Sequence, residues 1–173
     1  MRVLVIGASG GEGTLAVQLA VAAGAEVTGV CGPAKADLVR ALGAARVIDH
    51  TRTEINGRFD AIIDLAGNRS LRLLRRVLSP RGTLVLAGGE DGGRWLGGLD
   101  RQLRAALLNP FVGQRLRSLL SSENGADLRI LGELAASGRL APVVDRTFEL
   151  AETAAAMAYL TAGRARGKVV VVP

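Results

Sequence analysis

Residues 3–24 read Val-Leu-Val-Ile-Gly-Ala-Ser-Gly-Gly-Glu-Gly-Thr-Leu-Ala-Val-Gln-Leu-Ala-Val-Ala-Ala-Gly, and this stretch predicts the fold of the chain. The branched apolar run at residues 3–6 predicts a strand buried on both faces, as in a parallel sheet. A glycine-rich turn follows, and residues 14–23 are expected to form a helix with one apolar face. Strand, glycine turn and helix in this order are typical of a dinucleotide-binding turn.

The glycines of this turn have separate expected roles. Gly7 lets the backbone turn sharply where the strand ends, Gly10 lets it approach a pyrophosphate, and Gly13 lets the helix pack closely on the strand. Free amides and the helix dipole then favour an anion at the helix start. Glu12 is expected to face solvent, because a carboxylate beside bound phosphates is unfavourable. The spacing is one residue longer than usual, and the alternative is a glycine turn of another α/β protein.

Composition indicates a globular protein of one domain. The chain has 173 residues, of which 49% are hydrophobic and 22% charged, and this is ordinary for a soluble fold. We expect no membrane span, because no stretch is long and apolar enough. Cys31 is the only cysteine, so an internal disulfide or a cysteine zinc cluster is not expected. The strand at the N-terminus leaves no room for a signal peptide, and we expect a cytoplasmic protein.

The net charge of +6 comes almost wholly from arginine, because Lys35 and Lys168 are the only lysines among 22 basic residues. One interpretation is arginine-rich codon usage, and the other is an anionic partner, either a phosphorylated cofactor or nucleic acid. The arginines are scattered and only 3% of residues are aromatic. Both features disfavour nucleic acid as the anionic partner.

The end of the second expected strand, residues 25–30, predicts the choice of cofactor. An NAD-binding fold usually places a carboxylate there for the ribose hydroxyls, whereas this chain reads Cys31-Gly-Pro-Ala-Lys35. We therefore predict NADP(H) rather than NAD, with Lys35 pairing with the 2′-phosphate. A solvated Lys35 is the alternative. His50, the only histidine, is either a contact for the same phosphate or a structural residue.

Apolar runs and amphipathic segments alternate along the first half of the chain. They predict an α/β fold of Rossmann type, a doubly wound parallel sheet with helices on both faces. Helices are expected at residues 14–23, 34–42 and 70–78, and a turn is expected at residues 79–82. The further expected strands are residues 25–30, 46–50, 59–64 and 83–87. Ligands of such sheets lie beyond the carboxyl ends of the strands, which gather residues 7–13, 31–35, 64–67 and 87–89 along one rim.

In the second half of the chain, expected strands and helices alternate less regularly. Residues 90–99, with the only tryptophan, are expected to be a mobile loop. Helical pieces are expected at residues 99–108, 114–120, 126–136 and 151–162. Strands at residues 143–148 and 167–172 are expected to extend the main sheet. An apolar edge on these strands would favour a homodimer.

Five stretches, taken together, resemble the cofactor-binding domain of the medium-chain dehydrogenase/reductase superfamily, in particular its zinc-independent quinone oxidoreductase branch. They are Gly-Ala-Ser-Gly-Gly-Glu-Gly (7–13), Leu-Gly-Ala-Ala-Arg-Val-Ile-Asp-His (42–50), Phe-Asp-Ala-Ile-Ile-Asp-Leu-Ala-Gly (59–67), Leu-Ser-Pro-Arg-Gly-Thr-Leu-Val-Leu-Ala-Gly (78–88) and Ala-Arg-Gly-Lys-Val-Val (165–170). The family usually has Val in place of Glu12 and commonly an aromatic residue in place of His50.

The resemblance implies a set of cofactor contacts. The pyrophosphate would meet the turn, which holds Gly7, Ser9, Gly10, Gly11, Glu12 and Gly13. The 2′-phosphate would be surrounded by Gly32, Lys35 and His50. The ribose and nicotinamide would lie near Leu65, Gly88, Phe111 and Val112, and the far end of the cofactor near Lys168. The alternative for Phe111 and Val112 is a place in the core at a break between helices.

The resemblance also implies hydride transfer from NADPH to a quinone or conjugated carbonyl compound. Family members carry a β-rich domain that shapes the substrate pocket, and this chain is expected to lack it, so the domain would be supplied in trans or lost. We find no candidate catalytic acid or base and no metal-ligand spacing. A short-chain dehydrogenase is disfavoured because Gly163, not lysine, stands four residues after Tyr159. The alternative is an NADPH-binding module without turnover.

Overall fold

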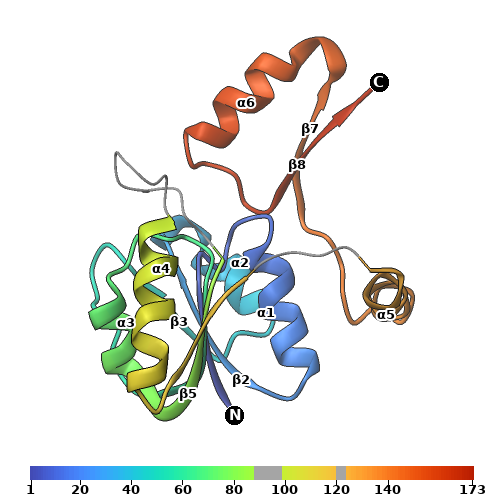
Figure 1. Ribbon diagram of the computed structural model, residues 1–173. Helices are drawn as coiled ribbons and strands as arrows, with labels where there is room; N and C mark the ends of the chain where they lie inside the picture. Colours follow the sequence, from blue (N-terminus) through green and yellow to red (C-terminus); the bar gives the residue numbers. More distant parts are fainter. Residues whose placement is uncertain (88–98, 120–123) are drawn as a thin grey trace.

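The computed structural model describes residues 1–87, 99–119 and 124–173 (Figure 1). Its centre is a six-stranded sheet with the strand order β3-β2-β1-β4-β5-β6, and every pairing in it is parallel. This is the strand order of the dinucleotide-binding fold, so the prediction of a doubly wound parallel sheet is confirmed. The strands are β1 (Arg2–Ile6), β2 (Glu26–Cys31), β3 (Arg46–Asp49), β4 (Phe59–Asp64), β5 (Leu78–Leu86) and β6 (Arg115–Ser118).

Helices cover both faces of this sheet, and the core is therefore double. Val3 and Val5 of β1 pack on the face covered by α1 (Gly13–Ala22) and α2 (Ala36–Ala41). Leu4 and Ile6 point to the other face, where α3 (Leu71–Val77) and α4 (Leu99–Leu108) lie. A short 3-10 turn, η1 (Pro33–Lys35), leads into α2. Burial on both sides is why β1 is a continuous apolar run rather than an alternating one.

The segment between α3 and the centre of β5 differs from the prediction of a turn at residues 79–82. Those residues belong to β5, but they bulge outward, because the register with β4 jumps from Phe59–Leu78 to Ala61–Thr83. The bulge uses up the extra chain length and leaves Leu84 and Leu86 in the core.

The predicted helix at residues 114–120 is wrong, because this segment contains strand β6. Residues Arg115–Ser118 pair in parallel with residues 83–86 of β5 and form one edge of the sheet. The sequence Arg-Leu-Arg-Ser buries only Leu116 and exposes its neighbours. This alternation has the period of two of a half-buried strand, and four residues are too few to distinguish it from a helix by pattern alone.

The C-terminal part does not extend the main sheet, and that expectation is wrong as well. Strands β7 (Val144–Glu149) and β8 (Lys168–Val172) form a separate parallel pair. They are joined through the 3-10 turn η3 (Leu150–Glu152) and helix α6 (Thr153–Thr161). Figure 1 places this unit beyond the carboxyl ends of the main strands, with α5 (Gly125–Ala136) to one side. One β-bridge, between Gly10 and Gly167, links it to the glycine turn.

Hydrogen bonds hold the C-terminal unit against the first half of the chain. The Gln18 amide on α1 donates to the carbonyl oxygen of Ala141 at 2.9 Å and accepts from its N–H at 2.8 Å. The Arg166 guanidinium donates to the carbonyl oxygen of Ala34. These contacts bring residues 163–169 over the glycine turn. Among the helices that the structure describes, none combines the length and the apolar character needed to cross a membrane.

Candidate functional site

The glycine turn has the geometry expected of a dinucleotide-binding turn. Gly7 has a φ of +86°, which only glycine adopts readily. A Cβ on Gly13 would lie 2.0 Å from the carbonyl oxygen of Gly7, so α1 could not pack this closely with any larger residue. At Gly10 the nearest protein atom to an added Cβ would be 3.5 Å away, which leaves that side of the backbone open for a ligand. We call the backbone of residues 10–13 the phosphate cradle.

The cradle presents backbone donors to a prospective anion. The N–H of Gly10 is bonded to the oxygen of Gly7 at 3.1 Å, and that of Thr14 to the oxygen of Gly10 at 3.0 Å. Within the described part of the chain, the N–H of Glu12 has no hydrogen-bond partner, whereas the N–H of Gly11 adjoins the β-bridge to Gly167. They precede α1, whose dipole adds positive potential at this end. Glu12 is exposed, as predicted.

The cradle lies at one wall of a hollow of about 580 Å³, which we call the cradle hollow. The structure brings most of the predicted contacts together here. The predicted residues in its lining are Gly7, Ser9, Gly10, Gly11, Glu12, Gly13, Lys35, Leu65 and Lys168. The lining also includes residues that sequence reasoning missed, among them Ala66 after β4 and Gly167 before β8. An elongated anion could therefore bind between the main sheet and the C-terminal unit.

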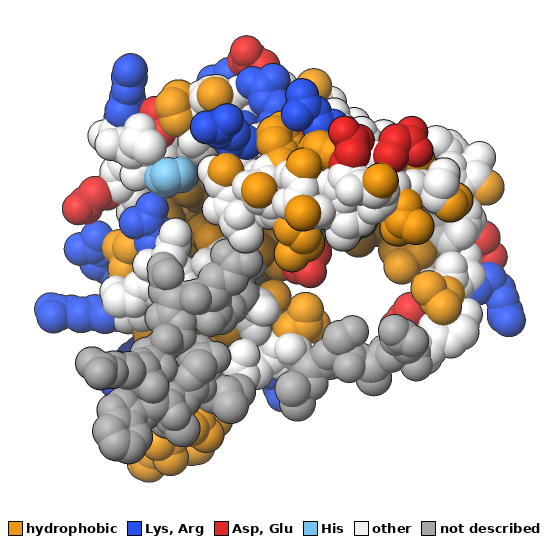
Figure 2. All heavy atoms as spheres, turned by 90° about the horizontal axis from the view of Figure 1, so that it is seen from above, with side chains coloured by type: hydrophobic (Ala, Val, Ile, Leu, Met, Phe, Trp, Pro, Cys, Tyr) orange, Lys and Arg blue, Asp and Glu red, His pale blue; other side chains and the backbone are white. Residues whose placement is uncertain are grey.

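A second, smaller hollow of about 220 Å³ begins where β2 ends, and we call it the β2 hollow. It shares Gly7, Ser9, Lys35 and Ala66 with the cradle hollow, so the two adjoin. Gly32 and His50, the other two residues predicted to bind a 2′-phosphate, line it. Figure 2 shows the single histidine on this face with Lys and Arg side chains close to it.

Lys35 is less free than the sequence suggested. Its Nζ donates to the carbonyl oxygens of Gly163, at 2.8 Å, and Ala165, at 2.7 Å, which lie just before β8. Burial lowers the pKa of the Lys35 ammonium, and the Asp145 carboxylate partly opposes this shift. Two of its three N–H donors are thus occupied by the C-terminal unit.

A family model described as "Zinc-binding dehydrogenase" matches residues 42–171. The chain belongs to this family. The match confirms the resemblance to the medium-chain dehydrogenases and reductases. Although the family is named after zinc, no group of three or more His, Cys, Asp or Glu side chains in the described ranges is placed to hold a metal ion.

The three similar proteins described next are oxidoreductases. The mitochondrial NAD(P)H oxidoreductase RTN4IP1 of Mus musculus is 33% identical over 187 residues, covering 98% of this chain and 47% of that protein. The chloroplastic quinone-oxidoreductase QR1 of Triphysaria versicolor is 34% identical over 180 residues, covering 99% and 52%. The solved quinone oxidoreductase from Coxiella burnetii is 28% identical, with a TM-score of 0.82 and coverages of 99% and 53%. The chain therefore spans about half the length of the relatives it matches.

The structure does not bring Phe111 and Val112 to the rim at the carboxyl ends of the strands, where the cofactor is expected to bind. They belong to the turn η2 (Asn109–Phe111) and its C-cap, before β6, at the amino ends of the strands. There they line a separate hollow of about 680 Å³ together with Arg58 and Gln114. Phe111 is 85% exposed, whereas Val112 packs against the core. The predicted contact at Gly88 and the expected loop at residues 90–99 fall outside the described residues, apart from Leu99 at the start of α4.

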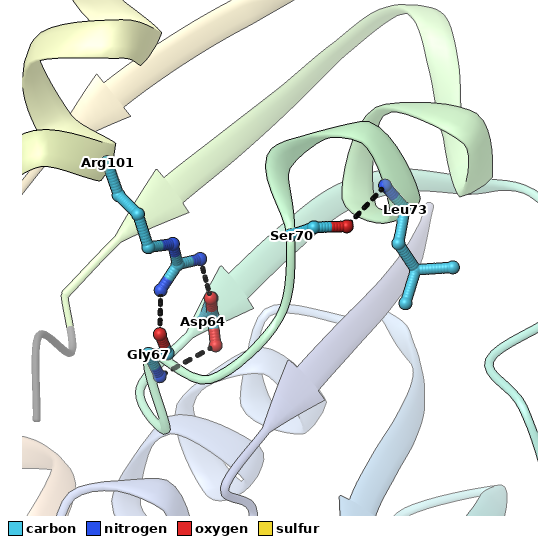
Figure 3. Close-up of polar contacts among 5 residues, drawn as sticks. All are labelled: Asp64, Gly67, Ser70, Leu73 and Arg101. Carbon is cyan, nitrogen blue, oxygen red and sulfur yellow. Dashed lines mark hydrogen bonds and ion pairs between the residues drawn. The ribbon is translucent and has the colours of Figure 1, made fainter. Parts of the chain in front are cut away.

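A buried ion pair that sequence reasoning missed holds the loop after β4 (Figure 3). Asp64 ends β4 and is 0% exposed. Its Oδ2 contacts Nη2 of Arg101 on α4 at 2.5 Å, and its Oδ1 accepts the N–H of Gly67 at 3.1 Å. Arg101 also donates to the Gly67 carbonyl oxygen, while Ser70 caps α3 by accepting the Leu73 N–H at 3.3 Å. The pair therefore fixes the loop that places residues 65 and 66 in the cradle hollow.

Proposed function

We propose that the chain is the NADPH-binding half of an oxidoreductase that reduces a quinone or a conjugated carbonyl compound. The observation that carries the proposal is the phosphate cradle, in which the unpaired Glu12 amide stands at the start of α1 and the backbone opens into the two adjoining hollows. Bound NADPH would supply the hydride. The chain's own part is to bind the cofactor and to orient its reactive end.

The residues of the cradle hollow have distinct parts in this proposal. The N–H group of Glu12 would donate to a pyrophosphate oxygen. Lys168 stands across the cradle, where a Cβ on Gly11 would lie 3.4 Å from its Cγ and 3.7 Å from its Nζ. Its ammonium would add a second positive group on the opposite side of the anion. Leu65 gives an apolar wall next to the turn.

NADPH rather than NADH is the proposed cofactor. Neither Asp nor Glu is among the residues that line the β2 hollow, whereas Lys35 and His50 are. A carboxylate there would repel a 2′-phosphate, whereas the Lys35 ammonium attracts it and the His50 ring can donate an N–H. The charges that line this hollow are therefore compatible with the adenosine end of NADPH.

A module that binds NADPH without turnover is the second candidate. The observation that favours it is the lining of the cradle hollow, where glycine backbone and the ammonium groups of Lys35 and Lys168 are groups that bind an anion. In the first proposal, a separate substrate domain would complete the pocket. Apolar side chains on the outer surface of α5 and α6 support such a partner, since Ile130 and Met157 are each 55% exposed.

A second copy of the chain could cover the same surface, and we propose a homodimer on that ground.

Two measurements on the purified chain test these proposals. Calorimetric titration should detect NADPH binding that is tighter than NADH binding, and failure of both to bind would refute the cofactor proposal. NADPH absorbance is then followed with a naphthoquinone, where turnover above the rate without protein would eliminate the non-catalytic module. Sedimentation at micromolar concentration should show a dimer, and a monomer would contradict the proposed assembly.

The cytoplasmic location also stays a proposal, because named relatives are mitochondrial and chloroplastic. The proposal is compatible with the single cysteine, Cys31, which is buried and free, as is usual in reducing compartments. Burial raises the pKa of this thiol, and the nearby Asp49 carboxylate raises it further. Fractionation of the source cells would test the location directly.

A further inference from the structure

The β2 hollow contains a cation that the sequence analysis did not consider. Arg69 comes from the loop between β4 and α3 and lines this hollow together with Gly32 and His50. It also lines the adjoining hollow, formed by residues 50–55 and Leu73. Since His50 belongs to both hollows, Arg69 lies beside it at their border. A Cβ on Gly32 would be 3.8 Å from Nε2 of His50, an ordinary van der Waals distance, so the imidazole lies close to this glycine.

The Arg69 guanidinium lacks a partner in the part of the chain that the structure describes. Its Nε is buried without a hydrogen bond, and no ion pair joins it to a described carboxylate. Glu54 is the acidic residue of the adjoining hollow. Its Oε2 lies 3.7 Å from Nη2 of Arg76, so it pairs with that arginine and not with Arg69. A buried donor without an acceptor is costly. The Nε is closed to a ligand, whereas the terminal amino groups of the same guanidinium have no described partner and can donate to an anion in the hollow.

Lys35 uses its donors differently. Its bonds to Gly163 and Ala165 tie the start of α2 to the C-terminal unit, next to the positive Arg166. An ammonium held by two carbonyl oxygens is already partly neutralised by their dipoles. Its geometric effect is to keep residues 163–165 against the β2 hollow, which Gly163 lines.

We infer that Arg69 is the residue that recognises the 2′-phosphate of the adenosine, and that Lys35 acts mainly by positioning the C-terminal unit. The inference rests on the proposed function. Arginine suits this part because its planar guanidinium can give two parallel hydrogen bonds to a phosphate and is always charged. The neighbouring apolar residues Ile6, Val30 and Ala66 would face the adenosine.

The test compares two fragments of the cofactor, 2′,5′-ADP and 5′-AMP, by calorimetric titration against the full chain. Arg69→Gln should weaken 2′,5′-ADP about tenfold to a hundredfold, the usual effect of losing a charge-assisted contact, and leave 5′-AMP unchanged. Lys35→Met should weaken both fragments alike. Arg72→Gln is the matched control. It removes the same charge from the hollow that Phe111 and Val112 line at the amino ends of the strands, and it should change the affinity for neither fragment.

Arg69→Lys keeps a charge but loses the forked geometry, so its loss should fall between those of wild type and Arg69→Gln. Circular dichroism checks that each variant is folded. The inference is overturned if Lys35→Met alone loses selectivity for 2′,5′-ADP, or if Arg69→Gln weakens both fragments equally. If wild type binds NADPH and NADH equally, this inference and the proposed preference for NADPH fail while cofactor binding stands, whereas absence of binding by both also refutes the proposed function.

Discussion

Replacing Arg101 by methionine should destabilise the protein strongly, although methionine keeps much of the apolar length of the side chain. The Asp64 carboxyl is 0% exposed and would lose its cation. Breaking a buried ion pair from one side costs about 3 to 5 kcal/mol. In a chain of this size each kcal/mol lowers the melting temperature by about 2 to 4 °C. The expected fall is therefore about 6 to 20 °C.

The same change should also weaken NADPH binding below the melting temperature. Arg101 donates to the oxygen of Gly67 as well as to Asp64, so the loop that carries Leu65 and Ala66 would lose two ties at once. Urea and thermal unfolding measure the stability, and calorimetric titration at 25 °C measures the affinity. Arg104→Met is the matched control, because Arg104 is exposed on the same helix. It should change the free energy of unfolding by no more than about 0.5 kcal/mol.

A double variant separates the ion pair from other effects of the arginine. Asp64→Asn combined with Arg101→Met leaves no uncompensated charge, and removing both partners of a buried pair is often nearly neutral. The double variant should therefore be more stable than Arg101→Met alone. If Arg101→Met unfolds at the same temperature as Arg104→Met, the pair does not hold this loop and the reasoning is refuted.

Two further predictions concern the cradle and the C-terminal unit. Gly10→Ala should fold normally, since its Cβ would lie 3.5 Å from the nearest protein atom. It should weaken NADPH and NADH alike by at least about tenfold in titrations, while Gly132→Ala on α5, with no atom within 4 Å of its Cβ, leaves binding unchanged. Burial raises the pKa of Asp145, but the Tyr159 hydroxyl and the Arg166 N–H outweigh this and lower it. The stabilisation is therefore present above about pH 4 and lost as pH falls through the lower folded pKa, so the difference in urea stability between wild type and Asp145→Asn should shrink in acid. A difference that stays constant down to pH 3 would count against this assignment.

The backbone geometry of the glycine turn could be predicted from residues close in sequence. The roles of Gly7 and Gly13 follow from backbone conformation and close packing, and the structure has both features. The rule that ligands lie beyond the carboxyl ends of parallel strands also located residues 31–35 and 64–67. The same rule could have found Arg69, which comes five residues after β4. Its position was overlooked because nothing in the local pattern distinguishes it from the many surface arginines.

The predictions were wrong where the structure of a short segment depends on which distant segment it pairs with. Leu116 lies in a strand because β5 offers a free edge, and four alternating residues do not show this by themselves. Strands β7 and β8 pair with each other and not with the main sheet. Phe111 was predicted at the cofactor rim, but the direction of β6 carries it to the opposite rim.

The sequence by itself determined the glycine turn, the buried strand before it and the alternation of strands and helices, because these depend on backbone sterics and on burial periodicity within a few residues. Only the tertiary structure decided that Lys35 is bound by carbonyl oxygens 128 and 130 residues away. It also decided that Asp64 meets Arg101 and that Arg69 lies beside His50. Such contacts depend on how whole elements pack, and a charged side chain carries no local signal of the partner it will meet.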